Sequence, residues 1–391
     1  MTASTGSVVV GAYEHPGRSL PGYTVPRVLR EVTDGVLADA GLGLADVDGF
    51  FCDSTVPGFG PSDIMGYLGL NCTYAESTDV GGSAYIAYLG HADAAIRAGK
   101  CRVALITLAG LPKADPRNFV GRELVPGPAA PFDVVGTVGG HGPVADYALT
   151  ARRHMYEFGT TAEQLAWIRV AASEHAQHNP DAVFRDPVTV EQVVDSPLIA
   201  DPIRRLDCCV ITDGGGALLV VHPDVARELG RAGARLRGHG EANHNIDTGR
   251  VDLTWCGARR SGTQAFAMSG TTPKDIQYLS LYDSYTITVL MQLEDLGFCE
   301  KGKGGPFVEG GTLRARGGAL PFNTDGGGLC NNHPANRGGM TKVIEAVRQL
   351  RGEARPEVQV HGCELALVSG IGGRLSTRHV SATAVLERFS P

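Results

Sequence analysis

Apolar segments of strand length alternate with segments of helix length along this chain, and the alternation runs through two successive rounds. The first round begins with a β-branched segment at 7–13 and an amphipathic segment at 25–40, and it ends with the apolar segment 211–221. The second round begins near residue 235 and closes with 380–386. Apolar strands that alternate with helices predict an α/β fold in which helices cover the faces of the sheet.

Further segments fit the same rhythm. We expect strands at 47–52, 103–108, 235–240, 276–282 and 365–369, and helices at 86–98, 144–158, 162–179, 263–269, 286–296 and 339–352. A chain of 391 residues is too long for one simple core, so two related halves are predicted. The first is 1–222, with a loop excursion at about 110–200 that includes an irregular Gly- and Pro-rich segment at 112–142, and the second is 223–391.

Composition excludes several classes of protein. Hydrophobic residues make up 43% of the chain and charged residues 20%, as in ordinary globular proteins. A net charge of -7 argues against a nucleic-acid surface. No apolar run reaches the ~18 residues of a membrane span, and the N-terminus lacks the pattern of a secretion signal. Nine cysteines without a CxxC pair indicate reduced thiols in a cytoplasmic protein, and no metal site is predicted.

The 53 glycines are clustered beside apolar segments. Glycine is required where φ is positive or where two backbones approach closely, so the clusters predict loops that converge on a crowded internal site. The clusters are Gly81-Gly82, Gly139-Gly140, Gly214 to Gly216, Gly310-Gly311, Gly326 to Gly328, Gly338-Gly339 and Gly372-Gly373.

One of these clusters is the turn Gly81-Gly82-Ser83, which precedes an expected Ala-rich helix. A helix N-terminus favours negative charge and can lower the pKa of a thiol placed there. This turn holds no cysteine, and the nearest ones are Cys72 and Cys101. The turn is therefore either part of a binding site or an ordinary glycine turn before a core helix.

Polar residues follow the strand expected at 276–282 and open the next helix. Tyr282, Asp283 and Ser284 stand there, and strand ends are where α/β proteins bind ligands. Asp283 or Ser284 is equally explained as a helix N-cap, and Tyr282 as a core aromatic whose hydroxyl is hydrogen-bonded.

The segment 322–339 is dense in polar residues and glycine, and it leads into a helix. It contains Asn323, Cys330, Asn332 and His333. The imidazole of His333 suits acid–base chemistry near neutral pH, with a surface histidine as the alternative. Cys330 lies three positions earlier, but no pattern establishes a Cys–His couple.

A third polar segment is the glycine-rich strand end 368–374, which includes Gly372. Its backbone N–H groups are candidates for an oxyanion hole. The segment does not open a βαβ unit near the N-terminus, so it is not a dinucleotide-binding fingerprint.

Taken in order, these segments resemble the sterol-carrier-protein-x-type branch of the thiolase superfamily across nearly the whole chain. The matching segments are 145–161, 202–217, Tyr282 to Tyr285, Asn332 to Pro334 and Gly370 to Gly373. The resemblance implies a thiolase fold, with two similar βαβαβαββ halves in a five-layer α-β-α-β-α arrangement and an inserted loop domain.

The departures from that branch imply the reaction. The turn at 79–83 lacks the acyl-accepting cysteine, the first histidine motif reads Tyr282, and Ser369 stands where a cysteine base is expected. In these respects the chain is similar to steroid side-chain-cleaving aldolases. The resemblance implies a lyase that cleaves a β-hydroxyacyl-CoA by a retro-aldol reaction, such as a 17-hydroxy C22 steroid carboxyl-CoA, to a ketone and propionyl-CoA.

The same resemblance assigns roles to individual residues. Tyr282 and His333 are expected to be catalytic, and the helix that follows Tyr282 is expected to favour an ionised hydroxyl. The residues expected to orient the site or form the oxyanion hole are Asp283, Asn323 and Gly372. The residues expected to line the substrate are Gly81, Gly82, Ser83, Cys330 and Asn332.

The resemblance also implies partners. We expect a homodimer through the sheet edge of the first half, with the strand 103–108 near the interface. A small OB-fold zinc-ribbon partner would complete a heterotetramer and would carry the only zinc, while this chain needs no cofactor. The alternatives are an acyl-CoA acyltransferase that uses Cys330 or another cysteine, and a non-catalytic acyl-CoA-binding subunit.

Overall fold

The computed structural model describes residues 6–53, 56, 58–115, 143–245, 252–334, 338–374 and 378–391. Most of the irregular segment expected at 112–142 lies outside these residues. The strands are β1 (Val8–Glu14), β2 (Gly49–Asp53), β3 (Tyr74–Thr78), β4 (Val103–Gly110), β5 (Leu198–Ala200), β6 (Ile203–Arg204), β7 (Gly214–Val221), β8 (Gly233–Asn245), β9 (Tyr278–Leu281), β10 (Leu365–Arg374) and β11 (Arg378–Phe389).

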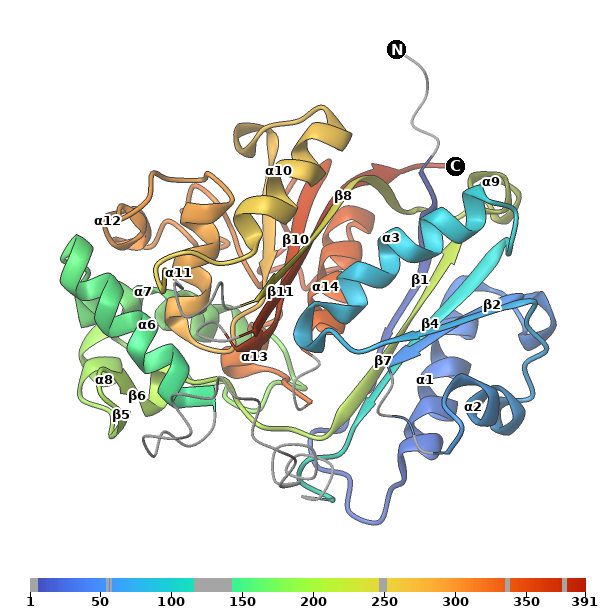
Figure 1. Cartoon of the computed structure of the whole chain (residues 1–391), viewed down its shortest axis with the longest axis horizontal. Helices are drawn as coiled ribbons and strands as arrows, with labels where there is room; N and C mark the ends of the chain where they lie inside the picture. The colour runs from blue at the N-terminus through green and yellow to red at the C-terminus, as the bar shows by residue number, and fades with distance from the viewer. Residues whose placement is uncertain are drawn as a thin grey trace.

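The helices complete the α/β alternation (Figure 1). They are α1 (Val25–Ala40), α2 (Pro61–Leu68), α3 (Ala84–Arg97), α6 (Pro143–Phe158), α7 (Ala162–Ala176), α8 (Val190–Val194), α9 (Pro223–Leu229), α10 (Ala258–Ser269), α11 (Thr286–Asp295), α12 (Gly304–Val308), α13 (Gly327–Cys330) and α14 (Gly339–Arg351).

Nine strands form one sheet in the order β3-β2-β4-β7-β1-β8-β11-β10-β9. The first five of these belong to the first half of the chain and the last four to the second. The halves meet where β1 pairs with β8, at Val8 opposite Arg235 and Val9 opposite Ala234. The sheet is therefore continuous between the halves over only a short stretch, and the exact boundary expected at residue 222 stays a prediction.

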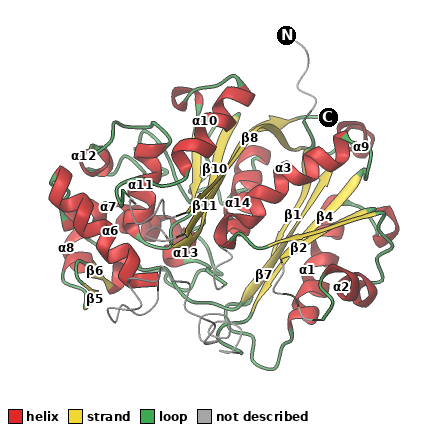
Figure 2. Cartoon of the chain, viewed as in Figure 1, coloured by secondary structure: helices red, strands yellow, loops and turns green. Residues whose placement is uncertain are grey.

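Helices α3 and α14 lie between the strands of the two halves, whereas α1 covers the outer face of the first half and α10 that of the second (Figure 2). The sequence explains this placement. In α1 the buried residues follow helical spacing along one face. In α3 every residue from Ala84 to Leu89 is buried, because strands of both halves pack against it. The layers are α-β-α-β-α, and the predicted α/β class is confirmed.

The long connection between β4 and β7 carries α6, α7 and α8 and the two-stranded sheet of β5 and β6. These elements gather beside α11 and α12 of the second half (Figure 1). Helix α7 packs against α11 and α13, so this connection reaches the strand ends of the second half, where the polar segments of the sequence lie.

Helix prediction succeeded where capping residues mark the ends. The helix predicted at 25–40 coincides with α1. The Thr24 hydroxyl accepts the N–H of Arg27 at 3.4 Å, and Gly41 ends the helix with φ 70°.

The edge of the sheet was not predicted from the sequence. Strand β3 and helix α2 were not predicted, because the residues of β3 alternate between half-buried and exposed and form no apolar run. As a result the strand expected near the sheet edge, 103–108, lies inside the sheet between β2 and β7, and β3 forms the edge. Among the described residues, no helix is long and apolar enough to cross a membrane.

His91 on α3 links the edge strand to the second half. Its Nδ1 lies 2.5 Å from Oε1 of Glu76 on β3, and its Nε2 lies 2.9 Å from Oε1 of Glu241 on β8. The hydrogen bond to Glu241, then the one to Glu76, raises the pKa of His91 to about 10. His239 lies 3.8 Å from the same oxygen of Glu241. The protonated ring therefore ties two carboxylates from opposite halves.

We predict that His91→Gln destabilises the fold most below pH ~6.5 and progressively less as the pH rises toward 10. The folded-state pKa lies above the ordinary value of about 6.5, so the stabilisation is complete below pH ~6.5 and is lost as pH rises through about 10. Urea unfolding at pH 6 should show a loss of about 1–3 kcal/mol that shrinks by pH 10. The exposed His361→Gln is the control, and a loss independent of pH would contradict the assignment.

Candidate active site

Tyr282 and His333, which the sequence placed on separate segments, meet in the structure. The Tyr282 hydroxyl and His333 Nε2 lie 3.0 Å apart and share a hydrogen bond. The rings cross edge to face with centroids 5.4 Å apart. Both side chains are buried, with 4% and 6% of their surface exposed. A phenol and an imidazole at this distance can exchange a proton.

The end of β9 fixes Tyr282. Its backbone N–H donates to Ser369 O on β10 at 2.9 Å, and its carbonyl accepts from Gln292 Nε2 on α11 at 2.6 Å. The preceding residue, Leu281, is held by the Asn323 side chain, which accepts its N–H and donates to its carbonyl, each at 2.9 Å. Asn323 thus forms with Leu281 the pair of hydrogen bonds that the backbone of a neighbouring strand would otherwise form.

Asn323 makes these bonds from an unusual backbone conformation. Its φ of 40° lies in the left-handed region, which asparagine tolerates better than most residues. Its side-chain amide forms both of these hydrogen bonds with the backbone of β9. These bonds fix the strand end before Tyr282, and the predicted role of Asn323 in orienting the site stays a prediction.

The expectation that Tyr282 is ionised was wrong. Burial raises the pKa of Tyr282 well above its ordinary value, and nearby groups, including Tyr147 and Cys209, raise it further. Helix α11 begins only at Thr286, with Tyr285 at its N-cap, so neither Asp283 nor Ser284 caps it. Desolvation outweighs the helix dipole over this separation, and Tyr282 is a neutral phenol.

The turn before α3 packs directly against the Tyr282 ring. A Cβ on Gly82 would lie 2.2 Å from Cε2 of Tyr282 and 2.5 Å from the carbonyl oxygen of Ile371. No side chain fits there without displacing the ring. Glycine is therefore required at position 82, because the Tyr282 ring occupies the space that a side chain would need.

The rest of the turn contacts β10. A Cβ on Gly372 would lie 1.8 Å from Val80 O, and one on Gly81 would lie 3.1 Å from the Cα of Gly372. The Ser83 hydroxyl is buried and donates to Val80 O at 2.6 Å. Gly81, Gly82, Ser83 and Gly372 thus form one wall beside the Tyr282–His333 pair, and the serine hydroxyl is engaged with the backbone.

Asp283 connects the Tyr282 segment to α13. Its Oδ1 accepts the N–H of Gly328 at 2.8 Å and its Oδ2 that of Leu329 at 3.2 Å. Lys342 Nζ on α14 lies 2.7 Å from Oδ1, and both charged side chains are almost fully buried. Asp283 therefore holds the start of the loop that leads to His333, and its predicted role in the reaction stays a prediction.

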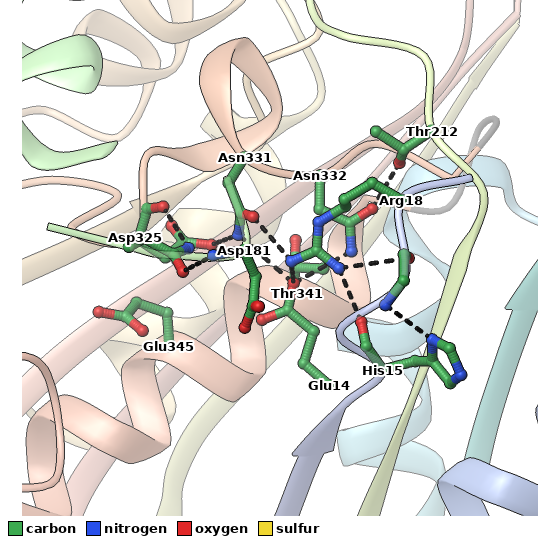
Figure 3. Close-up of polar contacts among 12 residues, drawn as sticks. Glu14, His15, Arg18, Asp181, Thr212, Asp325, Asn331, Asn332, Thr341 and Glu345 are labelled. Atoms are coloured by element: carbon green, nitrogen blue, oxygen red, sulfur yellow. Dashed lines mark hydrogen bonds and ion pairs between the residues drawn. The ribbon is translucent and has the colours of Figure 1, made fainter. Parts of the chain in front are cut away.

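Asn332 lies in a polar cluster with Glu14, Arg18 and Thr212 (Figure 3). Its Oδ1 accepts from the Thr212 hydroxyl at 2.5 Å, and its Nδ2 donates to Glu14 Oε1 at 3.0 Å. Both amide atoms of Asn332 thus have protein partners, and the predicted substrate contact of Asn332 stays a prediction.

Cys330 is buried in α13 and is not a reactive thiol. Burial raises the pKa of Cys330 to about 11. Burial also raises the pKa of each of the other cysteines, all of which are described residues. They are Cys52, Cys72, Cys101, Cys208, Cys209, Cys256, Cys299 and Cys363. Because the thiolate is the nucleophile, an acyl-enzyme mechanism has no suitable cysteine here.

Sequence reasoning missed three residues that hold this site. Thr212 accepts the N–H of His333 at 3.0 Å, Lys342 pairs with Asp283, and Glu14 binds Asn332. A charged residue that ends an apolar strand, as Glu14 does, was the available signal. Among the described residues no group of three or more His, Cys, Asp or Glu side chains could hold a metal ion.

We predict that Gly82→Ala perturbs the site because its methyl group would overlap the Tyr282 ring. The free energy of unfolding should fall by about 1–3 kcal/mol, as expected for overpacking. Gly66→Ala is the matched control, since a Cβ at Gly66 on α2 meets nothing within 4 Å. That helix substitution should be neutral or stabilise by about 0.5–1 kcal/mol. Equal unfolding midpoints in urea for the two variants would refute the contact.

Comparisons with known proteins identify relatives of this chain. A family model described as "Thiolase C-terminal domain-like" matches residues 240–388. The 17-hydroxy-3-oxo-4-pregnene-20-carboxyl-CoA lyase of Mycobacterium tuberculosis is 34% identical over 88% of this chain and 91% of its own. The steroid side-chain-cleaving aldolase of Thermomonospora curvata is 33% identical over 88% of this chain and 89% of its own.

Two further comparisons differ in extent. The acetyl-CoA acetyltransferase of Methanothermobacter thermautotrophicus is 42% identical, but the match covers 60% of this chain and only 61% of that protein, less than two thirds. The solved Ltp2-ChsH2(DUF35) aldolase superposes with a TM-score of 0.85 at 29% identity, over 98% of each chain.

Proposed function

The chain belongs to the thiolase superfamily, among its steroid side-chain-cleaving aldolases, which are carbon–carbon lyases, and on this basis we propose that it cleaves a β-hydroxyacyl-CoA by a retro-aldol reaction. The observation that carries the proposal is the hydrogen bond between Tyr282 and His333 in a site without a reactive thiol. A retro-aldol cleavage needs a base and an acid but no covalent intermediate.

The reaction divides into two proton movements. The β-hydroxyl of the substrate loses its proton, the C–O bond becomes a ketone, and the electron pair of the broken Cα–Cβ bond forms the enolate of the departing acyl-CoA. The enolate carbon then gains a proton. Atoms and electrons balance without an oxidant, a reductant or a metal ion.

Tyr282 is assigned to the substrate hydroxyl and the nascent ketone. Because it is a neutral phenol, it accepts the substrate proton while passing its own proton to His333 Nε2, 3.0 Å away. His333 then supplies the proton for the enolate. The backbone N–H groups of the Gly372 strand end are proposed to stabilise the thioester oxygen, beside the wall formed by Gly81, Gly82 and Ser83.

The proposed substrate is a 17-hydroxy C22 steroid carboxyl-CoA, and the proposed products are a 17-ketone and propionyl-CoA. The name of the Mycobacterium tuberculosis relative supports this choice. Coenzyme A enters with the substrate, and no further cofactor is proposed for this chain.

We predict that Tyr282→Phe and His333→Ala each reduce turnover by about 10²–10⁴-fold, the usual effect of losing one acid–base group. Mass spectrometry of the released ketone and propionyl-CoA measures the rate. Tyr156→Phe, which alters a tyrosine that is 80% exposed, is the control. Binding of the CoA ester should change little in both site variants.

Two outcomes would replace the proposal. An acyl group found on Cys330 or another cysteine would favour the acyltransferase alternative. Absence of any cleavage by the unaltered chain together with its partner would leave the non-catalytic binding alternative.

For assembly we propose a homodimer through β3 and a heterotetramer with an OB-fold zinc-ribbon protein. The outer side of β3 has no neighbouring strand among the described residues, and Ala75 and Ser77 are exposed on it. The name of the superposed aldolase structure includes a DUF35 protein, which supports a partner of this kind. Zinc is expected only in that partner, and a cytoplasmic location stays a prediction.

We predict a light-scattering mass of about twice 41.1 kDa for the isolated chain. Ser77→Lys should convert it to a monomer, because a two-fold axis would bring two lysines together at a strand edge. Ser62→Lys on the exposed surface of α2 is the control. A Ser77→Lys protein that remains dimeric would place the interface elsewhere.

A further inference from the structure

The two residues before His333 bind one buried carboxylate that comes from the other half of the chain. Asn332 Nδ2 donates to Glu14 Oε1 at 3.0 Å, and Asn331 Nδ2 donates to the same oxygen at 3.3 Å. Glu14 is the last residue of β1, and its side chain is 5% exposed. Figure 3 shows Glu14 and Arg18 facing the two asparagines.

Two arginines hold the charge of Glu14. Arg18 Nη2 lies 2.8 Å from Oε1 of Glu14, and Arg348 Nη1 lies 3.2 Å from Oε2. Burial opposes ionisation, but the charges of Arg18 and Arg348 outweigh it, so the pKa of Glu14 is lowered. Arg18 also donates to Asn331 Oδ1 at 2.8 Å. The carboxylate therefore stays ionised and stays in place.

The contact continues from Asn332 to His333. The Thr212 hydroxyl donates to Asn332 Oδ1 at 2.5 Å and accepts the backbone N–H of His333 at 3.0 Å. The backbone N–H of Thr212 in turn donates to His333 O at 3.3 Å. A continuous series of hydrogen bonds thus joins the Glu14 carboxylate to the peptide unit that carries the imidazole.

We propose that Glu14 is a positioning residue for His333, which acts through Asn332 and Thr212 to set the separation of His333 Nε2 from the Tyr282 hydroxyl. Glu14 itself touches neither Tyr282 nor the imidazole. The proposal rests on the proposed function, because the separation matters only if the pair transfers a proton. Proton transfer requires the two atoms to stay within about 2.6–3.2 Å.

The expected effect follows from geometry. Misplacing a catalytic group by about 1 Å can cost about 10²-fold in rate. Loss of the contact between Glu14 and Asn332 should lower kcat and leave the KM for the acyl-CoA nearly unchanged, because Glu14 does not bind substrate.

The test compares Glu14→Gln with Glu294→Gln. The glutamine at position 14 keeps the size and one acceptor but removes the charge that Arg18 and Arg348 hold. Glu294 is also buried and ion-paired, with Lys301 Nζ at 3.2 Å and His154 Nε2 at 3.0 Å, but it supports no residue of the His333 loop. Glu14→Gln should reduce kcat by about 10–100-fold, and Glu294→Gln should not.

A second readout does not depend on activity. The chain has twelve histidines, and selective ¹³C labelling with His333→Ala as the assignment reference identifies the His333 signal by NMR. Glu14→Gln should shift that signal, and Glu294→Gln should leave it in place. Thr212→Val removes the hydroxyl and keeps a side chain of similar size, so it should shift the His333 signal as well. It is the substitute variant if Glu14→Gln does not fold.

The outcomes separate the two proposals. If Glu14→Gln folds with unchanged kcat and an unchanged His333 signal, or if Glu294→Gln loses as much activity, Glu14 is not a positioning residue. If the unaltered protein cleaves no CoA ester while Glu14→Gln still shifts the His333 signal, the positioning holds and the proposed function fails.

Discussion

The close approach of Gly82 to the Tyr282 ring is the contact on which the rest of the site depends. A Cβ at position 82 would lie 2.2 Å from the ring, so the turn before α3 and the tyrosine after β9 fit only as a pair. The tyrosine brings a hydroxyl to His333, at 3.0 Å, in the space beside a turn that holds no cysteine. The cysteine-free turn and the Tyr282 hydroxyl beside it thus belong to one packed arrangement.

The contact between Gly82 and Tyr282 requires the two halves of the chain to keep a fixed relative position. The sheet contributes little to fixing that position, because β1 and β8 pair at only two positions. Side-chain contacts between the halves supply the rest. His91 joins β3 to β8 through two carboxylates, and Glu14 at the end of β1 binds Arg348 on α14. These ion pairs are partly buried, so salt screens them less than exposed pairs and they resist relative movement of the two halves.

The sequence predicted elements and catalytic candidates better than it predicted contacts. Helix α1 was predicted to the residue because Thr24 and Gly41 mark its ends, and Tyr282 and His333 were proposed because polar residues follow buried strands. The edge strand β3 was missed because it buries no apolar face. The hydrogen-bond partners of Asn332 were not predicted for a different reason. Sequence does not show which way a loop side chain points, and its partner Glu14 lies more than three hundred residues away.

Burial also decides which chemistry the site can support. The same desolvation that keeps Tyr282 a neutral phenol raises the pKa of every cysteine in the chain, so a charged nucleophile is disfavoured throughout. In the proposed retro-aldol reaction the negative charge develops on the substrate, and the protein carries only the proton that passes through Tyr282 to His333. The negative charge of the enolate resides mainly on the thioester oxygen, where preorganised N–H donors stabilise it more strongly than water would. A dry site with a phenol–imidazole pair and a wall of glycine backbone therefore favours cleavage of a carbon–carbon bond over acyl transfer.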